Sequence, residues 1–152
     1  MRATILNCTL KPSPSESNTE ALARVVIDAL EREDVETELV RVVDFDVKPG
    51  ITNDEGDGDE WSQILEKVLA AEILVIATPT WIGQPSSVAK RVLERMDALL
   101  SETDDEDRPV AYNRVAGFNK DWSKTTGETA AQNFVAVARA LAVNPVPAPP
   151  SG

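Results

Sequence analysis

The stretch EILVIATPTWIGQPSS, Glu72 to Ser87, joins two very different kinds of sequence. Its first part, EILVIA (72–77), is continuously apolar, as expected of a central parallel strand covered on both faces. The part that follows, TPTWIGQPSS (78–87), puts two prolines, a glycine, several hydroxyl residues and a tryptophan before the next helical pattern. This order predicts a buried strand that ends at a specialised loop.

Three further segments have the short, β-branched and apolar character of strands: ATILNCTL (3–10), ETELVRVVD (36–44) and NRVAGF (113–118). Apolar residues recur at helical spacing between and after these strands, as the runs that begin with Leu22, Trp61, Val88 and Ala131 show. Alternating strands and helices predict an α/β fold, a three-layer doubly wound parallel sheet. We expect the strand order 2-1-3-4.

Local signals predict where the helices begin. Ser17 with Glu20 and Thr125 with Glu128 have the spacing of capping boxes, and Pro85 suits the first turn of the third helix. The acid-rich segment NDEGDGDE (53–60) fails the calcium-loop pattern and suggests a solvated helix start, with Asp59 near the cap.

The composition limits the chemistry. The 152 residues include 26 acidic and 15 basic side chains, a net charge of −11, which disfavours nucleic acid and anionic membranes as partners. There is no histidine, and the single cysteine, Cys8, excludes an internal disulfide and a multi-cysteine metal site. Without a signal pattern or a membrane-length apolar run, we expect a cytoplasmic protein without a metal. Any redox or transfer chemistry then belongs to a cofactor.

Ligands of doubly wound sheets bind beyond the carboxyl ends of the strands, where the chain order reverses. For the order 2-1-3-4, the two loops that meet there are TLKPSPSESNT (9–19) and TPTWIGQPSS (78–87). The first ends at a helix N-terminus, which attracts an anion such as a phosphate monoester. The second offers a planar apolar wall for a flat heterocycle. Two simpler interpretations stay open: Ser17 only caps its helix, and Trp81 is a core or dimer-interface residue.

With these two loops, the sequence resembles the flavodoxin-like NAD(P)H-dependent FMN reductase family. The segment DWSKTTGETAAQNFVAVARALAVNPVPAP (121–149) is similar to the terminal helix of one branch of it. The resemblance implies FMN, with its phosphate on the first loop and its ring against the second. The cofactor-binding residues it implies are Leu10, Ser17, Asn18 and Thr19 at the phosphate end, and Pro79, Thr80, Trp81, Ile82 and Gly83 along the ribityl chain and ring.

The chain departs from the family pattern after the fourth strand. RVAGF passes almost at once to NKDWSKTTG, so a third flavin loop, a helix and the fifth strand are missing; aligning Asn119 and Asp121 to that loop is the alternative. We expect a domain over 1–144 with an internal deletion near 118–120 and a Pro-rich tail over 145–152. The edge of the fourth strand should be covered by the final helix or by a second subunit in a homodimer.

The expected function is an FMN-dependent oxidoreductase that passes hydride from NAD(P)H through bound FMN to a small acceptor such as flavin or quinone. No protein side chain is assigned a catalytic role, because the cofactor carries the chemistry. Two alternatives remain: a flavodoxin-type electron carrier, and a trimmed, flavin-poor member of the fold without catalysis.

Overall fold

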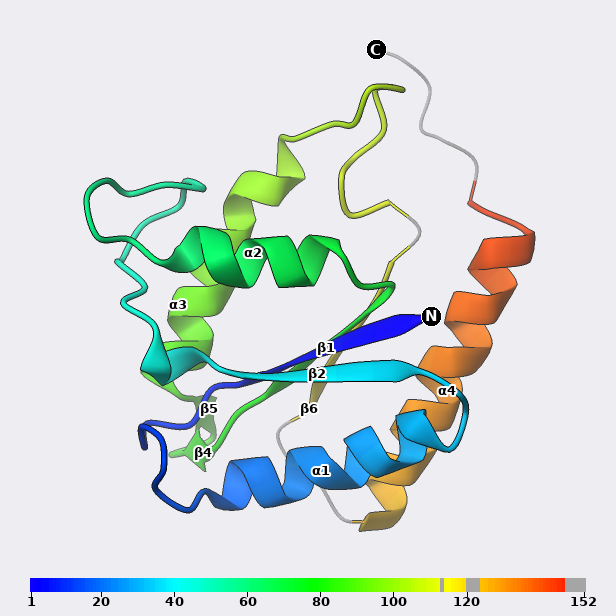
Figure 1. Cartoon of the computed structure of the whole chain (residues 1–152), viewed down its shortest axis with the longest axis horizontal. Helices are drawn as coiled ribbons and strands as arrows, with labels where there is room; N and C mark the ends of the chain where they lie inside the picture. The colour runs from blue at the N-terminus through cyan, green and yellow to red at the C-terminus, as the bar shows by residue number, and fades with distance from the viewer. Residues whose placement is uncertain (113, 120–123, 147–152) are drawn as a thin grey trace.

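The computed structural model describes residues 1–112, 114–119 and 124–146, in which strands and helices alternate (Figure 1). In chain order the elements are β1 (Arg2–Asn7), α1 (Asn18–Glu31), β2 (Glu36–Arg41), the short 3₁₀ helix η1 (Val42–Asp44), α2 (Trp61–Leu69), β3 (Ile73–Ala77), β4 (Thr80–Trp81), β5 (Gln84–Pro85), α3 (Ser87–Arg95), the 3₁₀ helix η2 (Met96–Leu100), β6 (Val115–Asn119) and α4 (Lys124–Val143).

The long strands form one parallel sheet in the order β2-β1-β3-β6, which confirms the predicted order. β1 lies between β2 and β3, with Leu6 opposite both Val40 and Ile76. All five residues of β3 are buried, as the apolar run in EILVIA requires. The α/β class is therefore confirmed.

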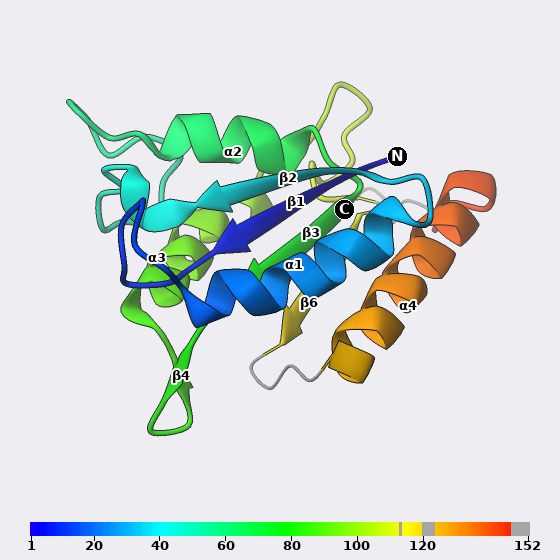
Figure 2. The same ribbon diagram turned by 60° about the horizontal axis from the view of Figure 1, so that its bottom comes forward.

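Helices cover both faces of the sheet in three layers (Figures 1 and 2). α1 and α4 lie side by side on one face, where Val26 and Val135 pack over Ile5 and Val75. α2 and α3 cover the other face, where Trp61 joins the core that contains Leu6. Each core uses alternate residues of the strands, because successive side chains point to opposite faces.

β6 is the last strand of the sheet among the described residues, and α4 packs against one of its faces. Phe134 of α4 packs so closely on Gly117 that a Cβ at this position would overlap the ring. Ala116, on the opposite face, is exposed. α4 thus covers the face of β6 at Gly117, and the expectation that the final helix or a second subunit covers the edge of this strand stays a prediction.

Some predicted features fall where the structure gives no description. Residue 120 of the deletion predicted near 118–120, Asp121 of the alternative alignment, and most of the tail predicted over 145–152 lie outside the described residues. The described chain passes from the end of β6 to the beginning of α4 with only residues 120–123 between them.

Two of the four predicted helix beginnings were correct. Asp59 lies at the beginning of α2 as predicted, where its Oδ1 accepts from the Trp61 N–H at 3.3 Å. Ser17 caps α1, with its Oγ accepting from the Glu20 N–H at 3.3 Å. Pro85 lies in β5 instead of a helical first turn, because the Ser86 side chain caps α3. α4 begins at Lys124, one residue before the predicted cap Thr125.

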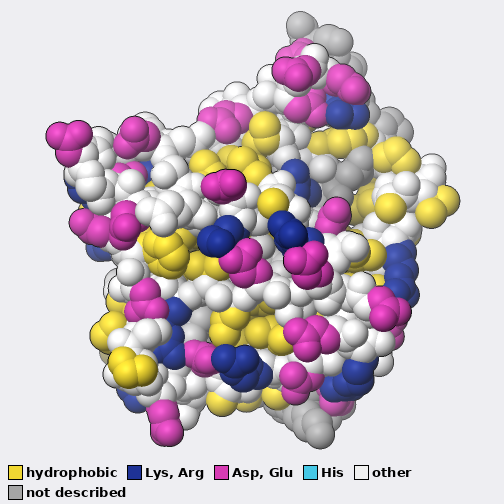
Figure 3. All heavy atoms as spheres, in the orientation of Figure 1, with side chains coloured by type: hydrophobic (Ala, Val, Ile, Leu, Met, Phe, Trp, Pro, Cys, Tyr) yellow, Lys and Arg dark blue, Asp and Glu magenta, His cyan; other side chains and the backbone are white. Residues whose placement is uncertain are grey.

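Acidic side chains are spread over the face seen in Figure 3, interspersed with Lys and Arg side chains. Within residues 1–112, 114–119 and 124–146, no helix has the length and apolarity needed to cross a bilayer. The same residues hold no group of three or more His, Cys, Asp or Glu side chains placed to bind a metal ion.

Candidate functional site

The carboxyl ends of β1 and β3 are joined by a buried hydrogen-bond network. The Cys8 N–H donates to the Ala77 carbonyl at 2.8 Å, and the Ser86 hydroxyl donates to the Cys8 carbonyl at 2.7 Å. The Ser86 N–H donates to Thr78 Oγ1 at 3.0 Å, and Ser86 Oγ accepts from the Ala89 N–H at 3.1 Å. The two unusual loops therefore leave the sheet from fixed positions next to each other.

The first loop ends at the N-terminus of α1. Ser17 has extended backbone angles, φ −131° and ψ 123°, and its side chain takes one of the amides of the first turn. The other first-turn amides of a helix lack intrahelical acceptors, and the helix dipole adds a partial positive charge there. Thr19, in this turn, is buried toward the sheet. This end of α1 has the chemistry of an anion site.

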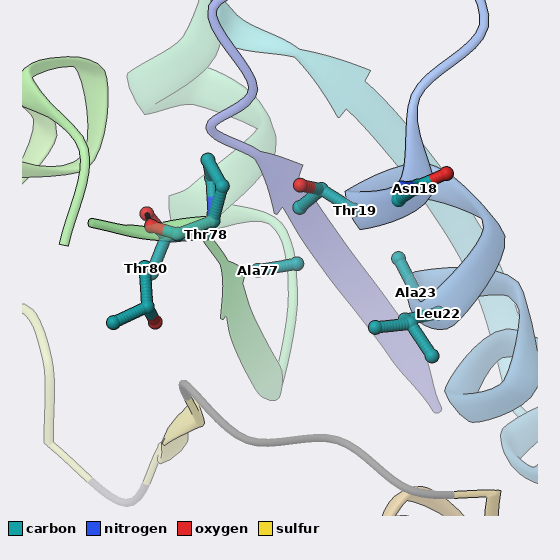
Figure 4. A pocket seen from close by; sticks show the side chains of 8 residues that line it. Asn18, Thr19, Leu22, Ala23, Ala77, Thr78 and Thr80 are labelled. Carbon is teal, nitrogen blue, oxygen red and sulfur yellow. Dashed lines mark hydrogen bonds between the residues drawn. The ribbon is translucent and has the colours of Figure 1, made fainter. Parts of the chain in front are cut away.

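A cavity of about 170 Å³ lies between this turn and the loop after β3. Thr19 and Leu22 on α1 point toward Ala77, Thr78 and Thr80 across the opening (Figure 4). This volume is below the roughly 300–1,000 Å³ of most small-molecule sites, so it can enclose only part of a nucleotide-sized ligand. A second hollow of about 370 Å³ shares Asn18 with the first and is lined by Ser15, Ser17, Arg24 and Arg41, among others.

The second loop forms a hairpin that the sequence did not predict. β4 and β5 pair antiparallel through a two-residue turn, and Figure 2 shows the hairpin projecting from the body of the protein. Ile82 and Gly83 both have positive φ, 51° and 73°, as in the hairpin turns that match strand twist. A β-branched residue such as Ile82 rarely adopts this conformation. Trp81 is half-exposed and Ile82 fully exposed, so the hairpin presents apolar surface to the outside.

The structure brings together some of the predicted site residues. Asn18, Thr19, Pro79 and Thr80 line the cavity. Ser17 lies beside them in the second hollow. The cavity lining does not include four others, Leu10, Trp81, Ile82 and Gly83.

Four lining residues were missed: Leu22, Ala23, Ala77 and Thr78. Helical spacing placed Leu22 in a predicted helix without a role in the site, but it is exposed and lines the cavity. Ala77 and Thr78 stand at the end of a buried strand. Their position at the carboxyl edge of the sheet is the sequence signal that could have identified them as site residues.

Side chains at the cavity offer hydrogen bonds and apolar surface without a titratable group. Cys8, whose N–H donates to the carbonyl of the lining residue Ala77, is fully buried, and burial raises the pKa of its thiol to about 12, so it stays protonated and unreactive. Asn7 is also fully buried at the end of β1, and no acceptor for its Nδ2 is found among the described residues. By strand alternation Asn7 shares its face with Ile5, the face covered by α1.

The sequence matches the model of the NADPH-dependent FMN reductase family over residues 1–149. The chain belongs to this family. It is 38% identical over 126 residues to the 8-demethyl-8-aminoriboflavin-5'-phosphate synthase of Streptomyces davaonensis, a match that covers 77% of this chain and 49% of that protein. The chain thus spans about half the length of this relative.

Solved structures show the same architecture. The crystal structure of RosB with bound 8-demethyl-8-formylriboflavin-5'-phosphate superposes with a TM-score of 0.84 at 27% identity, covering 96% of this chain and 82% of that one. An apo structure of the NADH:FMN oxidoreductase EMOB has a TM-score of 0.50 at 16% identity, covering 97% and 91%, and shares the fold. The flavodoxin-like fold is established by these likenesses.

Proposed function

We propose that this chain binds FMN at the carboxyl edge of its sheet and uses it to pass hydride from NAD(P)H to a small acceptor. The observation that carries the proposal is the convergence of two loops there, one ending at the N-terminus of α1 and one forming the β4–β5 hairpin. The family match supports the cofactor class.

The phosphate end of FMN suits the first turn of α1. Backbone amides of this turn and the polar side chains of Ser17, Asn18 and Thr19 would donate to the phosphate oxygens. These donors are uncharged, so binding rests on the helix N-terminus and oriented hydrogen bonds. Asn7, at the carboxyl end of β1, has a further buried donor, because its Nδ2 has no acceptor among the described residues.

The hairpin suits the flavin ring. Pro79 and Thr80 line the cavity, and the half-exposed Trp81 and the exposed Ile82 would lie along the ring outside it. Gly83 completes the positive-φ turn that carries them. Leu10, half-exposed on the first loop, would flank the phosphate end of FMN. Since the cavity encloses only part of the ligand, one ring face would stay open to a nicotinamide.

FMN, when bound, supplies hydride acceptance and donation between NAD(P)H and the acceptor, a flavin or a quinone. The residues of this chain bind and orient the cofactor. The cavity lining contains no acid or base, so no side chain is assigned a proton-transfer step. The proposed partner is therefore a small-molecule acceptor.

Steady-state NADH and NADPH oxidation with added FMN tests the proposal. We expect NAD(P)H oxidation that depends on FMN and is faster than the oxidation by free FMN without the protein. FMN binding without turnover would identify a flavodoxin-type carrier. The absence of any FMN binding would identify a trimmed, flavin-poor member of the fold.

A second candidate treats the flavin phosphate as substrate. It is favoured by the likeness to the synthase of Streptomyces davaonensis and to RosB holding a riboflavin-5'-phosphate derivative. Mass spectrometry of the flavin recovered after incubation distinguishes the two: a cofactor returns with the mass of FMN, and a substrate returns with a changed mass.

A further inference from the structure

The exposed segment Leu10–Glu16, which leads into α1, is fastened by an arginine from the neighbouring strand. Arg41, the last residue of β2, donates from Nη1 to the Ser15 carbonyl at 2.8 Å and to the Lys11 carbonyl at 3.3 Å. Its Nη2 forms an ion pair with Glu20 in the first turn of α1. Only 12% of the Arg41 side chain is exposed, so the guanidinium lies between the loop and the helix.

Asp44 holds the same loop from η1. The Ser13 N–H donates to Asp44 Oδ1 at 2.8 Å, and the Ser13 hydroxyl donates to Oδ2 at 2.6 Å. Desolvation raises the pKa of Asp44, but the two hydrogen bonds from Ser13 and the charge of Arg41 outweigh it, so the pKa lies below its usual range. The carboxylate is therefore the stable form at neutral pH.

Hydrogen bonds between residues of the loop itself add to those from Arg41 and Asp44. The Ser15 N–H donates to the Pro12 carbonyl at 3.0 Å, and Lys11 Nζ donates to the Glu16 carbonyl at 3.1 Å. All seven residues from Leu10 to Glu16 are exposed, so burial contributes little to fixing them. Ordering such a segment costs conformational entropy, which the ligand must overcome unless the protein has ordered it beforehand.

Arg41 also offsets a negative charge in the first turn of α1. A carboxylate in a first helical turn repels a phosphate placed at the same turn, and Glu20 is such a carboxylate. Hydrogen bonds from Arg41 and then from Arg24 hold the pKa of Glu20 below its usual value, so Glu20 is ionised. The Arg24 side chain is 60% exposed and that of Arg41 only 12%, so Arg41 offsets most of this charge.

We propose that Arg41, at the end of β2, and Asp44, at the end of η1, are positioning residues for phosphate binding, although neither belongs to the phosphate loop itself. They hold residues 10–17 in the receiving conformation, and Arg41 offsets the charge of Glu20. This proposal rests on the proposed function, because it assumes that the anion bound at α1 is the phosphate of a flavin mononucleotide.

The test compares two ligands that differ only in the phosphate. Arg41→Met and Asp44→Asn should each weaken FMN binding by about tenfold, a loss of about 1.4 kcal/mol, and leave riboflavin affinity unchanged. Arg24→Gln is the matched control, since Arg24 pairs with Glu20 but has no hydrogen bond to the loop carbonyls of Lys11 and Ser15. It should change FMN affinity by less than about threefold.

Equal losses of FMN and riboflavin affinity in Arg41→Met, or no loss of either, would overturn the proposal. If the wild-type chain binds neither flavin, the proposed function fails, and amide hydrogen exchange over residues 10–16 of the ligand-free protein tests the fastening alone. Faster exchange in Arg41→Met than in wild type and Arg24→Gln supports the fastening, and unchanged exchange contradicts it.

Discussion

Two loops of this protein are fastened by the same pair of residue types at different depths. In loop 47–60, Arg95 donates to the carbonyls of Thr52 and Lys48 at 2.9 and 3.0 Å and pairs with Asp59 at 2.7 Å. In the loop before α1, Arg41 and Asp44 make the corresponding bonds at the surface.

Burial separates the two arrangements. The side chains of Arg95 and Asp59 are 0% and 1% exposed, and the guanidinium lies over the Trp61 ring with its centre 5.6 Å away. The Arg41 and Glu20 side chains remain 12% and 20% exposed beside the proposed ligand site. A buried ion pair is costly to break, while a surface pair contributes little to folding. We infer that the first arrangement serves stability and the second serves binding.

The largest effect is expected at the buried pair. Asp59→Asn leaves the Arg95 charge uncompensated in the core and should destabilise the protein by about 3–5 kcal/mol. FMN affinity of the folded protein should not change, because no residue of loop 47–60 lines the cavity. Urea unfolding and flavin titration measure the two quantities. If Asp59→Asn kept full stability and bound FMN more weakly, loop 47–60 would serve binding instead of stability.

Acid should remove the contribution of Asp59. Desolvation raises the pKa of this carboxyl, but the Arg95 guanidinium and three backbone N–H groups outweigh it and hold the pKa well below its usual range. A lowered native pKa adds stability that is complete above the unfolded value of about 3.9 and is lost as the pH falls further. The stability difference between wild type and Asp59→Asn should therefore narrow below about pH 4. A difference that stays constant down to pH 2.5 would contradict this.

Alanine variants of Leu65 and Trp81 compare a position in the core with a position in the β4–β5 hairpin. Leu65 is buried in the core under α2, and Leu65→Ala should cost about 2–5 kcal/mol of stability with FMN affinity retained. Trp81 is half-exposed, and Trp81→Ala should leave the thermal midpoint nearly unchanged and weaken FMN binding by at least about 1 kcal/mol. If Trp81→Ala unfolds the protein and spares FMN affinity, Trp81 is a core residue.

The smallest effect on folding is expected at the surface fastening. Arg41→Met should lower the free energy of unfolding by about 1 kcal/mol or less, since its ion pair is partly solvated. Denaturant unfolding without ligand measures this. A loss comparable to that of Asp59→Asn would remove the distinction between the two loops.

The sequence predicted what local patterns and strand order determine. The apolar run of β3, the Ser17 cap and the convergence of the two loops follow from periodicity, capping chemistry and right-handed crossovers. Pairs that depend on tertiary packing were not predictable. The segment containing Asp59 was interpreted as a solvated helix start, because its partner Arg95 is 36 positions away in sequence and reaches it only after α3 packs.

A direct test of the central claim is a titration of the purified chain with FMN and riboflavin, followed by flavin fluorescence. The claim is that the helix N-terminus after the first loop binds the phosphate of a flavin. Charge-assisted hydrogen bonds contribute about 1.5–3 kcal/mol each, so FMN should bind at least tenfold more tightly than riboflavin. Excess inorganic phosphate should reduce FMN binding and spare riboflavin binding. Equal affinity for the two flavins, or no affinity for either, would contradict the account.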